Sequence, residues 1–196
     1  MPYTSEHKAR TRAKIVESAR KLFNRHGFEQ VSIDRIMGEA GLTRGGFYHH
    51  FRSKDELYAA AVASFSTCNP FRASVVTRGP QDAQQLARIL VDVYLSDEVL
   101  DDVDFHCPLY ALPNDVARAG LSPQKAYTQL MRNLVKVYAE AMAGHPECEE
   151  RAQTIVALCV GGMVLARTTD DPVLRQSMRA TARRQALALL DCAQPS

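Results

Sequence analysis

Residues 32–57, SIDRIMGEAGLTRGGFYHHFRSKDEL, carry the signals of two short helices, a tight turn between them and the start of a third helix. Ser32 stands where a side-chain oxygen caps the free amides of a helix start. An apolar series at helical spacing follows it: Ile33, Ile36, Met37 and Ala40. Gly41 comes directly after, and glycine adopts the positive φ that a tight helix exit needs. The pattern predicts a short amphipathic helix that ends at Gly41.

A second helix is expected at about residues 44–50, with Thr43 as its cap. It is too short to be stable alone in water, and each of its two glycines lowers helix stability by roughly 1 kcal/mol relative to alanine. Packing must therefore hold it in place. Phe47 and Phe51 lie four residues apart and are expected to share an inward face with Leu42.

The opposite surface of this second helix is expected to be cationic, hydroxylic and smooth. At helical spacing it pairs Arg44 with Tyr48 and Gly45 with His49. A recognition helix reads base edges in the major groove from its N-terminal residues, which here are Thr43 and Arg44. The stretch therefore predicts a helix-turn-helix and double-stranded DNA as its partner.

The third helix begins with a capping box, Ser53-Lys54-Asp55-Glu56. A helix N-terminus with a lysine beside it attracts an anion, because backbone amides and an ammonium group converge there. We expect Lys54 to contact a DNA phosphate. A base-reading helix would thus be flanked by phosphate contacts.

Charge supports this interpretation. Residues 1–60 contain 11 Lys or Arg against 7 Asp or Glu, whereas residues 61–196 contain 13 against 15. A basic end on a nearly neutral body is typical of a DNA-facing domain. Three alternatives stay open: a purely structural helical corner, an enzyme on a helical body, and a non-specific architectural protein. The modest net charge of +2 disfavours the last, and no nucleophile, base and oxyanion donor stand together in a motif.

The stretch closely resembles the N-terminal domain of the TetR family of bacterial transcriptional regulators, over roughly residues 10–60. Gly41-Leu42-Thr43, Gly45, the run from Phe47 to Phe51, and Ser53 to Leu57 carry the resemblance. It implies a dimeric repressor that binds a palindromic operator and releases it when a small molecule binds. It also implies DNA contacts by Ser32, Thr43, Arg44, Gly45, Tyr48, His49 and Lys54.

The whole chain is expected to be all-α, with about nine helices and no strand, because no segment alternates with period two. We expect a three-helix DNA-binding domain at residues 1–53 and a helical ligand-binding and dimerisation domain at residues 54–196. Residues 1–9 are expected to be a mobile arm, and residues 97–104 a solvated acidic connection without function. The five scattered cysteines match neither a disulfide framework nor a zinc site, and no cofactor is implied. With no secretory signal and no apolar run of membrane length, we expect a cytoplasmic protein.

The residues after the DNA-binding domain suggest two ways in which the protein could sense a chemical signal. Cys107 is expected at a helix N-terminus beside His106, where a thiolate is stabilised, and this favours the alternative of a thiol-based sensor of oxidants or electrophiles. The alternative is a cysteine that only lines a pocket or core. Aromatic and sulfur-containing residues are candidates for a ligand cavity: Phe65, Tyr94, Phe105, Cys107, Tyr110, Tyr127 and Met131.

The last two helices are expected to form the dimer. The helix near residues 147–168 carries small residues that permit close helix packing: Cys159, Gly161, Gly162 and Ala166. The final helix is rich in leucine near residues 187–190. A two-fold dimer would place paired recognition helices about one DNA turn apart.

Overall fold

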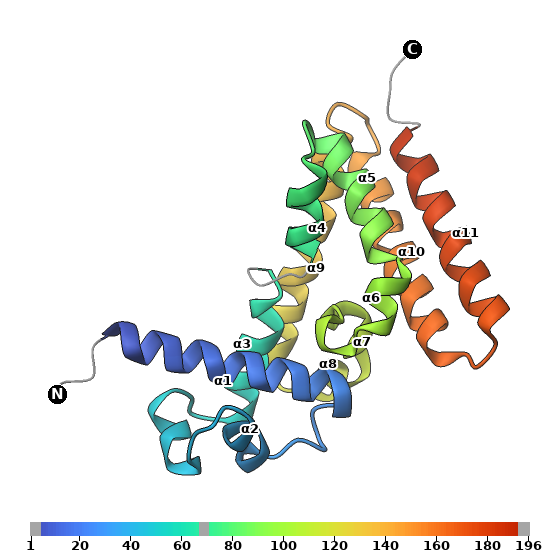
Figure 1. The fold of residues 1–196 in the computed structure, drawn as a ribbon. Coiled ribbons are helices and arrows are strands. Elements are labelled where there is room, and N and C mark those ends of the chain that lie inside the picture. The colour runs from blue at the N-terminus through green and yellow to red at the C-terminus, as the bar shows by residue number, and fades with distance from the viewer. Residues whose placement is uncertain (1–4, 67–70, 192–196) are drawn as a thin grey trace. The chain divides into compact units, whose positions relative to one another are not determined.

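A computed structural model describes residues 5–66 and 71–191, and these residues form eleven α-helices, two 3-10 helices and no strand (Figure 1). The all-α expectation is confirmed. The chain divides into two compact units, one made of residues 1–67 and 103–130 and the other of residues 68–102 and 131–196. This division follows contacts in space, and the predicted domain boundary between residues 53 and 54 stays a prediction.

The first unit is built on one long helix, which contacts three later elements. Its elements are α1 (Ser5–His26), α2 (Ile33–Glu39), η1 (Arg44–His49), α3 (Lys54–Ser64), η2 (Val103–Phe105), α7 (Pro108–Ala111), α8 (Pro113–Arg118) and the start of α9 (Leu121–Ala141). One side of α1 buries Ile15, Ala19 and Phe23 completely. This apolar side fits the spacing of three and four residues expected for a helix that faces a core.

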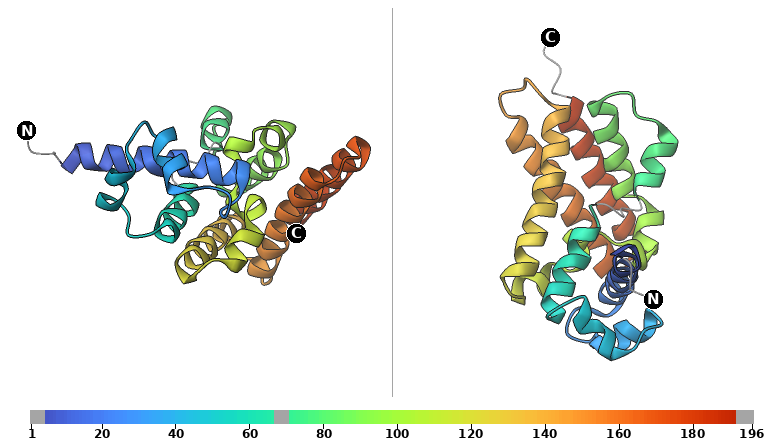
Figure 2. Two further views of the ribbon diagram at one scale, coloured as in Figure 1. Left: turned by 90° about the horizontal axis from the view of Figure 1, so that it is seen from below. Right: turned by 90° about the vertical axis from the view of Figure 1, so that its left-hand side faces the viewer.

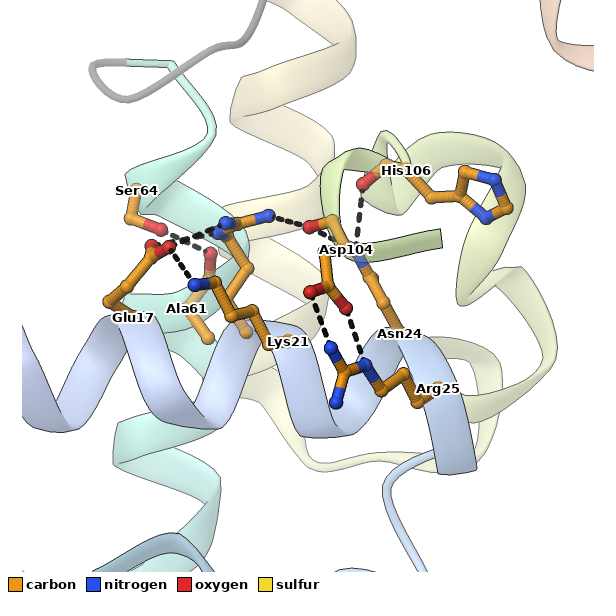
Figure 3. A network of polar contacts seen from close by, with 9 residues as sticks. Glu17, Lys21, Asn24, Arg25, Ala61, Ser64, Asp104 and His106 are labelled. Carbon is orange, nitrogen blue, oxygen red and sulfur yellow. Dashed lines mark hydrogen bonds and ion pairs between the residues drawn. The ribbon is translucent and has the colours of Figure 1, made fainter. Parts of the chain in front are cut away.

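The same helix holds the segment after residue 102 through a network of polar contacts (Figure 3). Arg20 is only 3% exposed, donates to the carbonyl oxygen of Asp104, and pairs with Glu17 at 2.8 Å. Asn24 Nδ2 donates to the carbonyl oxygen of His106 at 3.0 Å. Arg25 donates from two nitrogens to the two carboxylate oxygens of Asp104, each at 2.5 Å. Two parallel hydrogen bonds of this kind fix both the position and the orientation of the Asp104 carboxylate relative to Arg25.

The expectation for residues 97–104 is therefore wrong. Asp97–Asp101 form the helix α6, capped by Ser96, which accepts from the amide of Val99 at 3.3 Å. Val99 and Leu100 are buried, and burial of these two side chains turns an acidic stretch into ordered structure. Asp104 belongs to the network on α1 rather than to a solvated connection.

The second unit contains α4 (Phe71–Arg78), α5 (Ala83–Tyr94), α6, the remainder of α9, α10 (Cys148–Thr168) and α11 (Pro172–Asp191). α11 lies along α10 and also contacts α5 (Figure 2). An ideal Cβ on Gly162 of α10 would lie 2.9 Å from the Cβ of Ala182 and 3.3 Å from Cδ2 of Leu95. The close approach predicted for the small residues thus occurs within one chain at this position.

Several predicted boundaries need correction. α1 begins at Ser5, so most of the expected arm at residues 1–9 is helical, and residues 1–4 lie outside the described residues. α5 ends at Tyr94, and α4 adds a further short helix before it. Pro108 and Pro113 each start a short helix of their own, α7 and α8. These divisions account for more helices than the nine expected.

Two neighbouring glycines give a matched test of the packing of α10 on α11. In Gly162→Ala the new methyl group meets Ala182, whereas a Cβ on Gly161 has no atom within 4 Å. Alanine should stabilise the helix by up to about 1 kcal/mol at residue 161. Overpacking at residue 162 should outweigh that gain and leave a loss of about 1–2 kcal/mol in the free energy of unfolding. Urea unfolding followed by circular dichroism measures both, and equal stability of the two variants would contradict this packing.

Candidate nucleic-acid interface

The first helix of the predicted motif forms as its sequence indicates. Ser32 Oγ accepts from the amide of Arg35 at 3.1 Å and caps α2. Gly41 has φ of +65°, and Leu42 donates back to the carbonyl oxygen of Met37 at 2.8 Å. Both the cap and the glycine exit are confirmed, so the chain leaves α2 in a fixed direction.

The second helix differs from its prediction. Arg44–His49 form a 3-10 helix instead of an α-helix, and Thr43 makes no side-chain capping bond. The expected Thr43 cap is therefore wrong. Glycines at residues 45 and 46 weaken an α-helix, and short segments commonly take the tighter 3-10 form. Phe47 and Phe51 are 0% and 1% exposed, which confirms them as the anchors of this element.

The outer side of η1 gathers five of the predicted DNA contacts on one short element. Thr43, Arg44, Gly45, Tyr48 and His49 are all exposed. The Tyr48 ring, 61% exposed, packs edge-on against Phe47 at 5.2 Å between ring centres. A Cβ built on Gly45 would meet no atom within 4 Å, so the backbone is bare there. A rigid base thus presents a hydroxyl, a guanidinium, a phenol and an imidazole to solvent.

An ion pair that the sequence did not predict ties η1 to α2. Arg44 Nη1 lies 2.7 Å from Oδ2 of Asp34, and both side chains are more than half exposed. The pair bridges the turn, and its members are ten positions apart in the sequence. No motif or local spacing signals such a contact, which depends on how the turn folds.

The start of α3 is capped, but its lysine is partly engaged. Ser53 Oγ accepts from the amide of Glu56 at 3.1 Å, and the Glu56 carboxylate accepts from the amide of Arg52 at 2.8 Å. Lys54 Nζ donates to the carbonyl oxygen of Phe28 and lies 4.1 Å from the centre of the Phe28 ring. Burial lowers the pKa of Lys54. A phosphate contact by Lys54 stays a prediction, and it would have to share the ammonium group with this carbonyl.

A hollow of about 440 Å³ lies between the N-terminal half of α1, α2 and η1. Its lining residues are Lys8, Thr11, Met37, Leu42, Thr43, Gly46, His49 and His50. Burial and the nearby cations Lys8, His49, Arg12 and His7 hold the pKa of His50 below its usual value. The guanidinium of Arg12 stacks 4.4 Å from the centre of the Phe51 ring. Thr11 and His50 were not identified from the sequence as neighbours of the exposed side of η1.

The predicted ligand residues fall into both units. Phe65, Phe105, Cys107, Tyr110 and Tyr127 belong to the first, and Tyr94 and Met131 to the second. Phe65, Tyr94, Cys107 and Tyr110 are buried, whereas Phe105 and Met131 are 37% and 40% exposed. Tyr127 donates to the carbonyl oxygen of Leu109 at 2.7 Å, and burial raises its pKa to about 12. Within the first unit, α7 and the start of α9 therefore meet, and a ligand cavity stays a prediction.

Cys107 caps α7 with its backbone but makes no side-chain capping bond, and its side chain is 1% exposed. α7 has only four residues, so its dipole offers a thiolate little stabilisation. Cys107, Cys148 and Cys159 are free, while Cys68 and Cys192 lie outside the described residues. Enclosure of this kind fits the pocket-or-core interpretation better than a reactive sensor.

The described part of the chain shows neither a metal-binding cluster nor a membrane-spanning helix. In residues 5–66 and 71–191, no cluster of three or more His, Cys, Asp or Glu side chains is arranged to hold a metal ion. None of the helices in that part of the chain combines the length and the apolar character needed to cross a lipid bilayer.

Comparison with solved structures shows the same fold in known proteins. The reduced form of NemR from Escherichia coli is similar with a TM-score of 0.74 over 89% of this chain and 96% of that one, at 17% identity. This likeness establishes the fold alone.

Sequence comparison concerns the N-terminal domain. A family profile described as "Bacterial regulatory proteins, tetR family" matches residues 15–61. The TetC protein of transposon Tn10 from Escherichia coli is 50% identical over 50 residues, which are 26% of this chain and 25% of that protein. The HTH-type transcriptional repressor Rv1474c from Mycobacterium tuberculosis is 39% identical over 61 residues, 31% of this chain and 33% of that one. The chain thus covers a quarter to a third of these relatives. The N-terminal domain is therefore similar to that of the TetR family of bacterial regulatory proteins, over residues 15–61.

Proposed function

We propose that this chain is a cytoplasmic transcriptional repressor that binds a palindromic DNA operator as a homodimer and releases it on binding a small molecule. The observation that carries the proposal is η1, whose exposed Thr43, Arg44 and Tyr48 stand on the buried anchors Phe47 and Phe51. A surface that must read a groove needs polar donors on a rigid base, and η1 has both. A relative with a similar N-terminal domain is described as a transcriptional repressor, which favours the same role here.

The proposed contacts divide into two kinds. Thr43 and Arg44 would reach base edges, while the bare backbone at Gly45 would allow close approach to the groove floor. Tyr48, His49 and Lys54 would contact phosphates, and Ser32 would approach the backbone at the start of α2. Phosphate contacts fix the register, and base contacts provide the sequence preference.

The dimer is proposed through the outer faces of α10 and α11. Cys159, Gly162 and Ala166 are buried within the chain, so they do not form the outer face. A different stripe of α10 faces outward at a spacing of four residues: Ala157, Gly161 and Leu165. Leu165 is 49% exposed, and Val173 and Leu174 on α11 are 74% and 46% exposed. Apolar side chains left on two long helices favour burial against a second copy.

The effector is proposed to be an apolar or aromatic small molecule, because the candidate residues of the body are of that kind. The network of Arg20, Asn24 and Arg25 with residues 104–106 supports a route for its effect. Any shift of that segment must move against α1, which is packed on α2 and α3. The thiol-sensor alternative at Cys107 is not favoured, since the side chain is enclosed.

Tyr48→Ala tests the DNA surface. One neutral phosphate contact is lost, so the affinity for a duplex enriched from a random library should fall about threefold to tenfold. The loss should be similar for all sequences, and the salt dependence should not change, since no charge is removed. Fluorescence anisotropy measures the binding. Leu121→Ala, 73% exposed and outside the motif, is the control and should bind normally. Full affinity of Tyr48→Ala would contradict the assignment.

Leu165→Glu tests the dimer. A carboxylate placed in an apolar interface is desolvated without a partner, so the variant should sediment as a monomer where the parent sediments as a dimer. Val76→Glu is a matched control, because Val76 is an exposed apolar residue on α4, and it should leave the parent's state unchanged. A dimeric Leu165→Glu would rule out this face of α10.

DNA binding should also depend on pH through His50. Its pKa is lowered in the free protein by burial and neighbouring cations, and a phosphate nearby would raise that pKa in the complex. A group with the higher pKa in the complex favours binding at low pH and loses that contribution as the pH rises through that value. Affinity should therefore fall as the pH rises through the range in which histidine ordinarily titrates. His50→Gln should flatten this dependence, and His145→Gln in the second unit should not. An identical slope in the parent and His50→Gln would contradict the proposal.

A further inference from the structure

The ion pair between Asp34 and Arg44 places a carboxylate on a surface proposed to face DNA. Asp34 lies in the first turn of α2, directly beside the proposed backbone contact of Ser32. Its Oδ2 atom is 2.7 Å from Nη1 of Arg44, the proposed base reader. Two other acids of this domain have different partners: Glu17 pairs with Arg20, and Glu56 accepts from the amide of Arg52.

The Asp34 carboxylate neither stabilises the fold appreciably nor increases the affinity for DNA. The side chains are 56% and 64% exposed, and an ion pair this open contributes little to folding. Against a phosphate backbone, the negative charge of Asp34 is repelled and weakens binding to any DNA. What the pair does fix is direction: it holds one nitrogen of a planar guanidinium, and the other N–H donors then point in a set direction.

We propose that Asp34 is a positioning residue that determines which base Arg44 selects. With Nη1 held by the carboxylate, the opposite edge of the guanidinium is left to meet two acceptors on one base, the arrangement by which arginine recognises guanine. The pair strengthens when DNA excludes water from it. This inference rests on the proposed DNA binding and names a determinant of its sequence preference.

The test compares sequence preference with affinity. The full-length parent, Asp34→Ala, Asp34→Glu, Arg44→Ala and the double alanine variant are each used to select from a randomised duplex library. Binding to a selected duplex, and to the same duplex changed at one base pair, is then measured. Asp34→Ala should lower discrimination about tenfold at the base pair where Arg44→Ala also relaxes it. It should at the same time raise affinity for unrelated DNA, because a negative charge is removed.

Two variants separate positioning from simple charge. Asp34→Glu keeps the carboxylate and should restore most of the discrimination. Glu39→Ala removes an exposed acid on the same helix that makes no ion pair with a described residue. It should raise affinity for all duplexes alike and leave the preference unchanged. Both sites are exposed, so thermal midpoints close to that of the parent will show that the variants are folded.

Three results would overturn the inference. An equal change for every sequence in Asp34→Ala would reduce Asp34 to an electrostatic effect. If Asp34→Ala still altered the preference in the Arg44→Ala background, Asp34 would read a base directly rather than through Arg44. If Arg44→Ala alone relaxed the preference and Asp34→Ala did not, the pair would have no role on DNA. Failure of the proposed function is distinct, because then the parent itself would enrich no duplex.

Discussion

The burial of α1 is the constraint on which the first unit depends. Its apolar side packs against α2 and α3, and its polar side holds residues 104–106 through Arg20, Asn24 and Arg25. Arg20 is almost fully buried, so its charge is tolerable only while Glu17 and the carbonyl oxygen of Asp104 accept its hydrogen bonds. Removal of one partner from such a group is far more damaging than the pair is stabilising. The helix therefore joins two segments about forty residues apart in sequence into one body.

Local signals in the sequence predicted the helix-turn-helix well. Ser32, Gly41 and Ser53 act through their own backbone neighbours, and the structure has each of them in the expected role. Phe47 and Phe51 are buried as predicted, because a spacing of four residues places both on the same face of a helix. The 3-10 form of η1 was not predicted, although its two glycines were seen, because the balance between two helical forms over six residues depends on packing.

Long-range contacts were beyond prediction for a physical reason. Asp104 looked like part of a solvated acidic run, and only the fold brings Arg25 of α1 to its carboxylate. The pair of Asp34 and Arg44 and the contact of Lys54 with Phe28 have the same origin. In α10, the small residues were recognised, but Gly162 faces Ala182 of the same chain, whereas Gly161 meets open space. Helical periodicity shows that α10 has small residues on two faces, but it does not show which face packs against α11.

The 3-10 form of η1 also changes how far the reading element extends. A 3-10 helix rises about 2.0 Å per residue, so six residues measure about 12 Å along the axis, against about 9 Å for an α-helix. With three residues per turn, Tyr48 stands directly over the bare backbone of Gly45, and Arg44 no longer shares a row with Tyr48. Stacked base pairs are about 3.4 Å apart. The six residues of η1 therefore span the height of three to four stacked base pairs. An α-helix would need about eight residues to reach the same length.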